Sequence, residues 1–359
     1  MKAKIVKATS TSRVKLGEAA PLKTPFTLEI FPTNVCNFRC TYCAHSNRPK
    51  QYRPEWMSFE IYKKCIDDLN GFDNKLKLLL IAGLGEPLLH PDIDKMVRYA
   101  KDKNIAETVR IISNGSVLSP ELSDKLIAAG LDSLKISIQG LHDKKYKEMC
   151  NSPVPFDQIV QNVRYFYENK KDTIVNVKIV SDAFEKESDE QEFYQIFGDI
   201  CDEMNIEHVV GYQEGTNILK SGYISQTGTN TIKNEICQIP FYFLSVYPNG
   251  EIIPCCLLTF LKWKALSMGN VKNTDISRLW NEKVFHEFRL MHLEGQKAKH
   301  VVCKDCEEAY TSQCREEDNI DMFREELIFK YNKMLGGGRT VIPVIDLQSE
   351  RFRKWRQAS

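Results

Sequence analysis

Three cysteines, Cys36, Cys40 and Cys43, stand within eight residues in the stretch FPTNVCNFRCTYCAHSN. Three thiols fall short of the four that a structural zinc site takes, and zinc usually pairs a C-x2-C knuckle with a second knuckle or with histidines. A C-x3-C-x2-C string suits instead three thiolates that wrap one corner of a [4Fe–4S] cube. One iron of such a cube has no protein ligand. The spacing therefore predicts an iron–sulfur cluster with an open coordination site.

The other nine cysteines of the chain divide into isolated and clustered ones. Cys65, Cys150 and Cys201 stand alone and are interpreted as small buried hydrophobic side chains. The rest gather toward the C-terminus: Cys237, Cys255, Cys256, Cys303, Cys306 and Cys314. In a reducing compartment, clustered cysteines indicate metal sites rather than disulfides.

The charge and hydropathy of the chain limit its partners and its location. With 49 basic and 48 acidic side chains, the net charge gives no reason to expect nucleic acid or an anionic membrane as a partner. Residues 1–23 are basic but lack the apolar core of a secretory signal. No apolar run approaches the ~18–20 residues that span a bilayer. These features predict a cytoplasmic protein whose thiols are reduced.

Apolar strands and amphipathic helices alternate along residues 25–215. The run LKLLLIAG (76–83) is apolar throughout, which is typical of a parallel strand buried on both faces. Further strands are predicted at 25–32, 109–115, 133–140, 173–182 and 207–213, and helices at 58–72 (capped by Ser58), 91–103, 120–129, 156–170 and 189–204. Six strands that alternate with helices predict an α/β fold, a partial (β/α)6 TIM-like barrel.

The character of the sequence changes near residue 215. A polar, Gly/Thr/Ser-rich connector is followed by a hairpin that would turn at Asn249-Gly250 and by helices at 276–293 and 318–334. GGG at 336–338 precedes a basic tail. We therefore expect an N-terminal extension (1–24), a barrel (25–215), a small second domain (216–335) and a C-terminal tail (336–359).

The three-cysteine string and its context resemble the radical S-adenosylmethionine (SAM) superfamily. That family has an aromatic residue before the last cysteine, here Tyr42, and a glycine-rich GGEP element after the second strand, here GLGEP at 83–87. Leu84 replaces one glycine of the element, which is a mild departure because Gly85 remains before the glutamate. The resemblance implies that SAM chelates the open iron and contacts Tyr42, Gly83, Gly85, Glu86, Pro87, Ser113, Asn114, Ser137 and Gln139.

The resemblance also implies the chemistry of the active site. One electron from the reduced cluster cleaves the sulfonium of SAM, leaving methionine and a 5′-deoxyadenosyl radical. That radical takes hydrogen from an unactivated C–H bond, so the protein must hold the substrate carbon beside it and exclude water and oxygen. The expected redox partner is an electron donor of the flavodoxin or ferredoxin type.

The C-terminal cysteines resemble the SPASM and twitch auxiliary-cluster domains of radical SAM proteins. Twelve residues separate Cys237 from Gly250, four separate Gly250 from Cys255, and the pair Cys303-x2-Cys306 follows. The resemblance implies that Cys237, Cys255, Cys303 and Cys306 hold one fully ligated auxiliary [4Fe–4S] cluster. Cys256 and Cys314 are spare, and either could replace a neighbour. A zinc site made by the same four thiols is the competing interpretation.

A fully ligated cluster moves electrons rather than binding substrate. The layout is similar to that of a radical SAM dehydrogenase of an aminocyclitol, which implies oxidation of a hydroxyl-bearing carbon in a sugar- or cyclitol-like small molecule. Epimerisation of that carbon is a variant, for which Cys256 is a candidate hydrogen donor. A buried structural role is the simpler interpretation of Cys256.

Polar residues inside the predicted strands are the candidate substrate contacts. Asn176 and Lys178 interrupt an otherwise apolar strand, which points them into the barrel. Lys178 is interpreted either as a catalytic base whose pKa burial lowers, or as an ion-paired structural residue. Glu29, Lys135 and Gln213 are further lumen candidates, and His90 is expected to cap a turn.

Two other functions are alternatives to the small-molecule oxidoreductase. Many SPASM proteins modify ribosomal peptides, so a peptide maturase is the main alternative. Only about 25 residues precede the first strand, too few for the leader-binding domain of ~80 residues that such enzymes often carry. The second alternative is a non-catalytic zinc-binding interaction protein, which would be colourless and would not cleave SAM.

Overall fold

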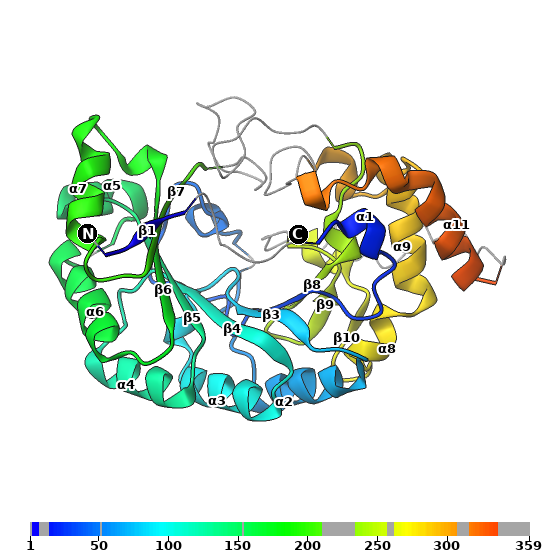
Figure 1. The fold of residues 1–359 in the computed structure, drawn as a ribbon, viewed down its shortest axis with the longest axis horizontal. Helices are drawn as coiled ribbons and strands as arrows, with labels where there is room; N and C mark the ends of the chain where they lie inside the picture. The colour runs from blue at the N-terminus through cyan, green and yellow to red at the C-terminus, as the bar shows by residue number, and fades with distance from the viewer. Residues whose placement is uncertain are drawn as a thin grey trace.

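The computed structural model describes residues 2–6, 14–50, 52–152, 154–209, 234–256, 262–306 and 316–336. Gln213, Cys314, nearly all of the predicted connector and nearly all of the predicted tail lie outside these residues. The described strands form one ten-stranded sheet in the order β1-β7-β6-β5-β4-β3-β2-β8-β9-β10, curved into an open arc (Figure 1).

The six central strands are parallel and neighbour one another in chain order, which confirms the predicted partial barrel. They are β2 (Thr27–Ile30), β3 (Leu76–Ile81), β4 (Ala106–Ser113), β5 (Ser133–Ile138), β6 (Ile174–Val180) and β7 (Glu203–Glu207). Their carboxyl ends therefore share one rim, the edge at which barrel enzymes build their sites.

Helices connect the strands and cover the convex side of the sheet (Figure 1). They are α2 (Phe59–Asp68), α3 (Ile93–Lys103), α4 (Pro120–Ala129), α5 (Asp143–Cys150), α6 (Phe156–Asn169) and α7 (Ser188–Phe197). Ser58 caps α2 as predicted, accepting a hydrogen bond from the Ile61 N–H at 3.3 Å. None of the helices found in the described ranges is long and apolar enough to cross a lipid bilayer.

Alternation along the strands separates an apolar face from a polar one. Apolar side chains of the strands pack with the outer helices in one continuous core that includes Leu79, Ile81, Val109, Ile111, Leu134, Ile136, Val177, Ile179, Met96 and Val163. The residues between them turn to the concave side, and on β5 to β7 these are Lys135, Asn176, Lys178, Asn205 and Glu207. The lumen of the partial barrel is therefore polar along these three strands.

The sequence-based boundaries fail at several elements. β7 lies at Glu203–Glu207 rather than at 207–213, because α7 ends at Phe197 and an E-M-N-I-E alternation follows. Helix α5 was missed, since its sequence is strongly charged. The helix expected over 276–293 is split into α8 (Ile276–Trp280) and α9 (Lys283–Leu293), and that expected at 318–334 begins only with α11 (Arg324–Met334).

The second region extends the barrel sheet instead of standing apart from it. β8 (Phe243–Val246) pairs in parallel with β2, and β9 (Glu251–Ile253) and β10 (Gly269–Asn270) continue antiparallel. The hairpin turn falls at Asn249-Gly250, as predicted. At the opposite edge, β1 (Lys4–Ile5) pairs with β7, and the short helix α1 (Leu16–Ala19) packs against the second region near α11 (Figure 1).

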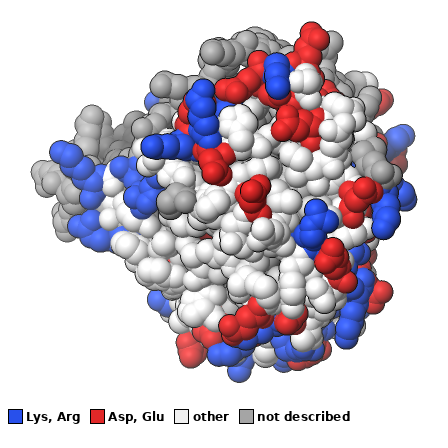
Figure 2. Space-filling view, turned by 90° about the vertical axis from the view of Figure 1, so that its left-hand side faces the viewer, with Lys and Arg blue, Asp and Glu red and all other residues white. Residues whose placement is uncertain are grey.

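The surface agrees with the balanced charge of the sequence. On the end of the molecule that carries α6 and α7, acidic and basic side chains are interspersed among uncharged ones (Figure 2). The described residues of this face thus carry charges of both signs.

Candidate functional site

The three-cysteine string forms a loop directly after β2, at the carboxyl rim of the barrel. Asn34 and Glu55 fix the start of the loop, since the Asn34 N–H donates to the Glu55 carbonyl (3.2 Å) and the Glu55 N–H donates to Asn34 Oδ1 (2.9 Å). Within the loop, the Arg39 guanidinium donates to the carbonyls of Cys36 (2.7 Å) and Phe38 (2.6 Å). Hydrogen bonds within the protein thus fix the backbone of the cysteine loop.

Helix α5 supports the other side of the loop. The last carbonyls of a helix have no intrahelical partner, and here those of Met149 and Cys150 accept from the N–H groups of Thr41 and Arg39, both at 2.8 Å. Cys150 is buried, as expected, but its thiol also reaches Cys40. That contact is the largest cause of the raised pKa of Cys40, ahead of burial. An apparently isolated cysteine therefore packs on the cysteine loop.

The three thiols of the loop lie close enough to influence one another. Burial raises the pKa of Cys36, and Glu86, Cys40 and Cys43 raise it further. Burial and Cys40 raise the pKa of Cys43 to about 11. Among the described residues, no three His, Cys, Asp or Glu side chains surround a point where one metal ion would sit. Three thiols on a single loop are a donor set that suits a multi-iron cluster, whose iron would replace their protons.

The glycine-rich element packs directly against this loop. Gly83 has φ +110°, and a Cβ there would lie 2.3 Å from the Phe31 ring. A Cβ on Gly85 would lie 2.4 Å from the Thr33 carbonyl and 2.6 Å from that of Val35. Only glycine fits at either position. In the described part of the chain, the two glycines thus allow residues of the segment 31–35 to pack closely against the glycine-rich element.

Glu86 joins the ends of β3 and β4. Its buried carboxylate accepts from the Leu88 N–H (3.0 Å), Ser113 Oγ (2.7 Å) and the Asn114 N–H (2.7 Å). Burial raises its pKa, against the lowering effect of these hydrogen bonds. Asn114 in turn donates through Nδ2 to Asn37 Oδ1 (2.9 Å) in the cysteine loop. The structure thus brings Glu86, Ser113 and Asn114 together, with Asn37 as a member that the sequence did not reveal.

The other residues that the resemblance implies as SAM contacts lie at or near the ends of neighbouring strands. Pro87 opens the short turn of helix after Glu86, and His90 caps it as expected, accepting at Nδ1 from the Asp92 N–H (3.1 Å). The Tyr42 hydroxyl donates to Gln139 Oε1, and Gln139 Nε2 donates to the Ser137 carbonyl (3.3 Å). The end of β5 is thereby tied to the cysteine loop.

Two lysines share one carboxylate in the lumen. Lys135 Nζ lies 2.8 Å from Glu207 Oε1, and Lys178 Nζ lies 2.5 Å from Glu207 Oε2. Burial alone would raise the pKa of Glu207, but the two ammonium groups outweigh it and hold the pKa well below its usual range. Burial lowers the pKa of Lys135 to about 8. Lys178 and Lys135 are therefore both ion-paired with Glu207.

Two amides beside this cluster each keep an open acceptor. Asn205 Nδ2 donates to Glu207 Oε1 (3.2 Å) and Asn176 Nδ2 donates to Glu203 Oε2 (3.4 Å). Because the carboxylates require donors, the amide oxygens must point away from them. Both Oδ1 atoms are buried without a hydrogen-bond partner in the described part of the chain. The lumen therefore offers two hydrogen-bond acceptors to a molecule that carries O–H or N–H groups.

Glu29 links the lumen to the second region. Ser245 Oγ lies 3.1 Å from Glu29 Oε2 and 2.8 Å from the Cys255 carbonyl. The single hydroxyl proton of Ser245 cannot be donated both to Glu29 and to the Cys255 carbonyl. Both hydrogen bonds form if Glu29 is protonated and donates to Ser245 Oγ, while Ser245 donates to the carbonyl. Burial raises the pKa of Glu29 to about 8, against a lowering by Ser245, in agreement with a protonated carboxyl at neutral pH.

Glu29→Gln is expected to stabilise the protein increasingly as the pH rises. Between the ordinary pKa of 4.5 and the folded value of about 8, folded Glu29 keeps a proton that the unfolded chain has released, so the wild type loses stability with rising pH. The variant lacks this loss, and its advantage should grow by up to roughly 3 kcal/mol between pH 5.5 and pH 8. Anaerobic urea unfolding at both pH values measures it, and a difference independent of pH would contradict the assignment.

Four cysteines of the second region surround a small cavity. Cys237, Cys255, Cys303 and Cys306 line it, together with Pro240, Pro254, Leu266, Phe288, His292, Lys297 and Val302. Burial raises the pKa of Cys237 and Cys303, and the other thiols of the set raise it further. The structure therefore gathers around one cavity the four cysteines that the resemblance implies as ligands. Cys256 is not among the described residues that line the cavity.

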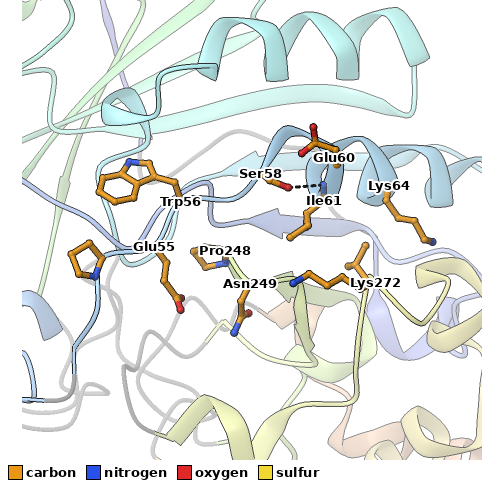
Figure 3. Close-up of a pocket in the computed structure, with 11 residues that line it drawn as sticks. Glu55, Trp56, Ser58, Glu60, Ile61, Lys64, Pro248, Asn249 and Lys272 are labelled. Carbon is orange, nitrogen blue, oxygen red and sulfur yellow. Dashed lines mark hydrogen bonds between the residues drawn. The ribbon is translucent and has the colours of Figure 1, made fainter.

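A larger pocket of about 750 Å³ lies on the surface where α2 meets the hairpin turn (Figure 3). Trp56, Ser58, Ile61 and Lys64 face Asn249 and Lys272 across it, with further walls from Pro54, Glu55, Glu60, Pro248 and Val271. None of the predicted site residues that the structure describes lines this pocket. It is therefore separate from both groups of cysteines.

Comparison with known proteins agrees with these sites. A family model described as the radical SAM superfamily matches residues 30–195, and a SPASM model described as an iron–sulfur cluster-binding domain matches residues 237–307. GTP 3′,8-cyclase from Chlorobaculum tepidum is 34% identical over 33% of this chain and 34% of that protein. The chain thus spans about a third of the length of this and another curated relative.

Solved structures share the fold. BtrN in complex with AdoMet and 2-DOIA has a TM-score of 0.50 and 19% identity, over 78% of this chain and 92% of that one. Streptococcus suis SuiB bound to precursor peptide SuiA has a TM-score of 0.59 and 18% identity, over 75% of this chain and 67% of that one.

The two family models together take in more than half of the chain. The first contains the cysteine loop and the glycine-rich element, and the second contains all four cysteines of the cavity. The chain therefore belongs to the radical SAM superfamily and carries a SPASM domain, so it is an enzyme whose cofactors are S-adenosylmethionine, the [4Fe–4S] cluster that binds it and an auxiliary [4Fe–4S] cluster.

Proposed function

We propose that the enzyme oxidises a hydroxyl-bearing carbon of a sugar- or cyclitol-like small molecule, with epimerisation of that carbon as a variant. In this proposal Cys36, Cys40 and Cys43 hold the SAM-binding cluster, and Cys237, Cys255, Cys303 and Cys306 hold the auxiliary one. When bound, these groups supply a hydrogen-abstracting 5′-deoxyadenosyl radical and a one-electron acceptor. The electron that starts the cycle comes from a flavodoxin- or ferredoxin-type donor.

The polar lumen is the observation that carries this proposal. Lys135, Lys178 and Glu207 form a buried charged cluster, and the unpartnered oxygens of Asn176 and Asn205 lie beside it. An apolar substrate would leave the two amide oxygens unsatisfied, which is costly in a buried site. A polyol presents several hydroxyl groups that donate to amide oxygens and accept from ammonium groups.

The same cluster can manage the proton of the oxidised hydroxyl. To form a ketone, the substrate loses a hydrogen atom from carbon, a proton from oxygen and one electron. Lys178, which is paired with Glu207, would donate a hydrogen bond to the substrate oxygen and ease its ionisation. Burial lowers the pKa of Lys135 to about 8, so Lys135 is the candidate proton acceptor.

The chain also offers a route for the electron. Glu29 lies in the lumen, and Ser245 joins its carboxyl to the backbone of Cys255, one of the four cysteines around the cavity. This short chain of contacts connects the substrate region to the proposed auxiliary site. It supports an acceptor role for that site.

Modification of a peptide is the second candidate function. The likeness in fold to SuiB bound to its precursor peptide, with the higher TM-score of the two structures, favours it. Only the fold is shared at that level of identity, so the chemistry of the lumen decides between the candidates.

Hydrogen transfer from labelled substrates tests the proposal. The anaerobically reconstituted enzyme is incubated with SAM, a reductant and either polyols deuterated at the carbinol carbons or labelled peptides. Mass spectrometry of the 5′-deoxyadenosine should show deuterium from a polyol, together with the ketone or the epimer as product. Deuterium that comes only from a peptide would reject the small-molecule proposal in favour of the second candidate.

A further inference from the structure

A histidine, His292, lines the cavity between the four cysteines of the second region. It lies near the C-terminal end of α9 and is only 4% exposed. Neither ring nitrogen has a hydrogen-bond partner within the described ranges. Burying an imidazole costs free energy that a hydrogen bond normally offsets, so nearly all buried polar groups are paired. The unpartnered ring therefore indicates a hydrogen-bonding group that is not part of the described chain.

Two other histidines of this region have ordinary structural roles. His300 accepts at Nδ1 from the N–H groups of Val302 and Cys303, both at 3.3 Å, and so shapes the loop that carries one thiol. His286, earlier on α9, packs against the Tyr331 ring with centroids 5.5 Å apart and is not among the described residues that line the cavity. His292 differs from both, because it combines a place in the cavity wall with the lack of a described partner.

One neighbour fixes the ring of His292. The Phe288 ring, one helical turn earlier, meets it edge to face with centroids 4.9 Å apart. An imidazole carries at least one N–H donor in either charge state, and four cysteines line the same cavity.

We propose that His292 is a positioning residue of the auxiliary site, donating an N–H hydrogen bond to a sulfur of the cluster that Cys237, Cys255, Cys303 and Cys306 hold. The inference rests on that proposed ligand set and is independent of the proposed substrate. A reduced cluster carries one more negative charge than an oxidised one, so a hydrogen bond to sulfur stabilises the reduced form more. His292 therefore raises the reduction potential of the auxiliary cluster.

A positive charge at the auxiliary site acts in the same direction. Lys297 lines the cavity and donates through Nζ to the Cys306 carbonyl (3.3 Å). Positive charge and hydrogen-bond donors favour a reduced cluster. Lys297 is therefore expected to raise the reduction potential of the auxiliary cluster together with His292.

A redox titration of His292 variants tests the proposal. Cys36, Cys40 and Cys43 are replaced by alanine in all samples so that only the auxiliary cluster remains, and EPR follows its reduction. His292→Leu should lower the ratio of reduced to oxidised cluster about tenfold at the wild-type midpoint, which equals a shift of about 59 mV to more negative potential. His292→Gln, whose amide can still donate, should shift less, and the matched control His286→Leu should not shift.

An unchanged midpoint in His292→Leu at full iron content overturns the proposal. If His292→Leu fails to take up its cluster, pulsed EPR of the unsubstituted His292 protein with ¹⁵N-labelled histidine decides. A weak coupling to the imidazole nitrogen supports a hydrogen bond, whereas a strong one marks an iron ligand and overturns it, as does the absence of any coupling. Because the readout is not turnover, a failed substrate assignment leaves this result standing.

Discussion

Replacing Cys36, Cys40 and Cys43 together by alanine is expected to abolish the formation of 5′-deoxyadenosine from SAM. Their thiols are the proposed donor set of the loop at the barrel rim, and hydrogen bonds from Arg39, Asn34 and α5 to the loop backbone remain when the thiols are removed. The fold should therefore survive while the SAM-binding cluster is lost. Iron per chain should fall from about eight to about four, measured with deoxyadenosine after anaerobic reconstitution.

Cys65→Ala is the matched control for this experiment. Cys65 is fully buried on α2, belongs to the apolar core and is not one of the proposed cluster ligands. Its replacement should leave the iron content and the deoxyadenosine yield unchanged, at a stability cost of about 1 kcal/mol for the lost packing. A triple variant that keeps eight irons would contradict the ligand assignment.

Glu207→Gln is expected to destabilise the protein by about 3–5 kcal/mol at neutral pH, because it leaves two buried lysines without their counter-charge. Lys135 and Lys178 lie 2.8 and 2.5 Å from this carboxylate and have side chains that are 8% and 17% exposed. Anaerobic urea unfolding measures the loss. The variant should also impair binding of a polyol substrate, since the two ammonium groups would no longer be held in place.

Removing the whole cluster provides the control. A triple variant with Lys135→Met, Lys178→Met and Glu207→Leu deletes all three charges, and well-packed apolar replacements of buried ion pairs are often neutral or stabilising. Its stability should therefore return toward that of the wild type, while substrate binding stays lost. A Glu207→Gln variant within 1 kcal/mol of the wild type would show that the lysines are solvated and not buried against the carboxylate.

The barrel was predictable because its signals are local. Continuous apolar strands such as Leu76–Ile81 and capped helices such as that after Ser58 each lie within a dozen residues, and the structure has them nearly where expected. The order of the six parallel strands then follows from their alternation with helices. The errors fall where local propensity misleads, as in the charged helix α5 and in the short strand β7.

The site was only half predictable, for a related reason. The two groups of cysteines can be recognised from spacing, but their supports come from distant segments. Ser245 reaches Glu29 across 216 positions, and Lys135 reaches Glu207 across 72. The pairing of β8 with β2, which creates the first contact, has no sequence signature. The alternation along its strand predicted that Lys178 faces the lumen. Its partner Glu207 was less predictable, because the last strand of the barrel was expected at 207–213, four residues later than β7 begins in the structure.

EPR of the anaerobically reconstituted wild type, before and after addition of SAM, tests the central claim most directly. The claim is that the loop of Cys36, Cys40 and Cys43 holds an iron–sulfur cluster with one iron open to SAM. We predict about eight irons per chain and a reduced-cluster signal, absent from the triple cysteine variant, that changes when SAM binds. A zinc-loaded loop, or a loop cluster whose spectrum is indifferent to SAM, would contradict it.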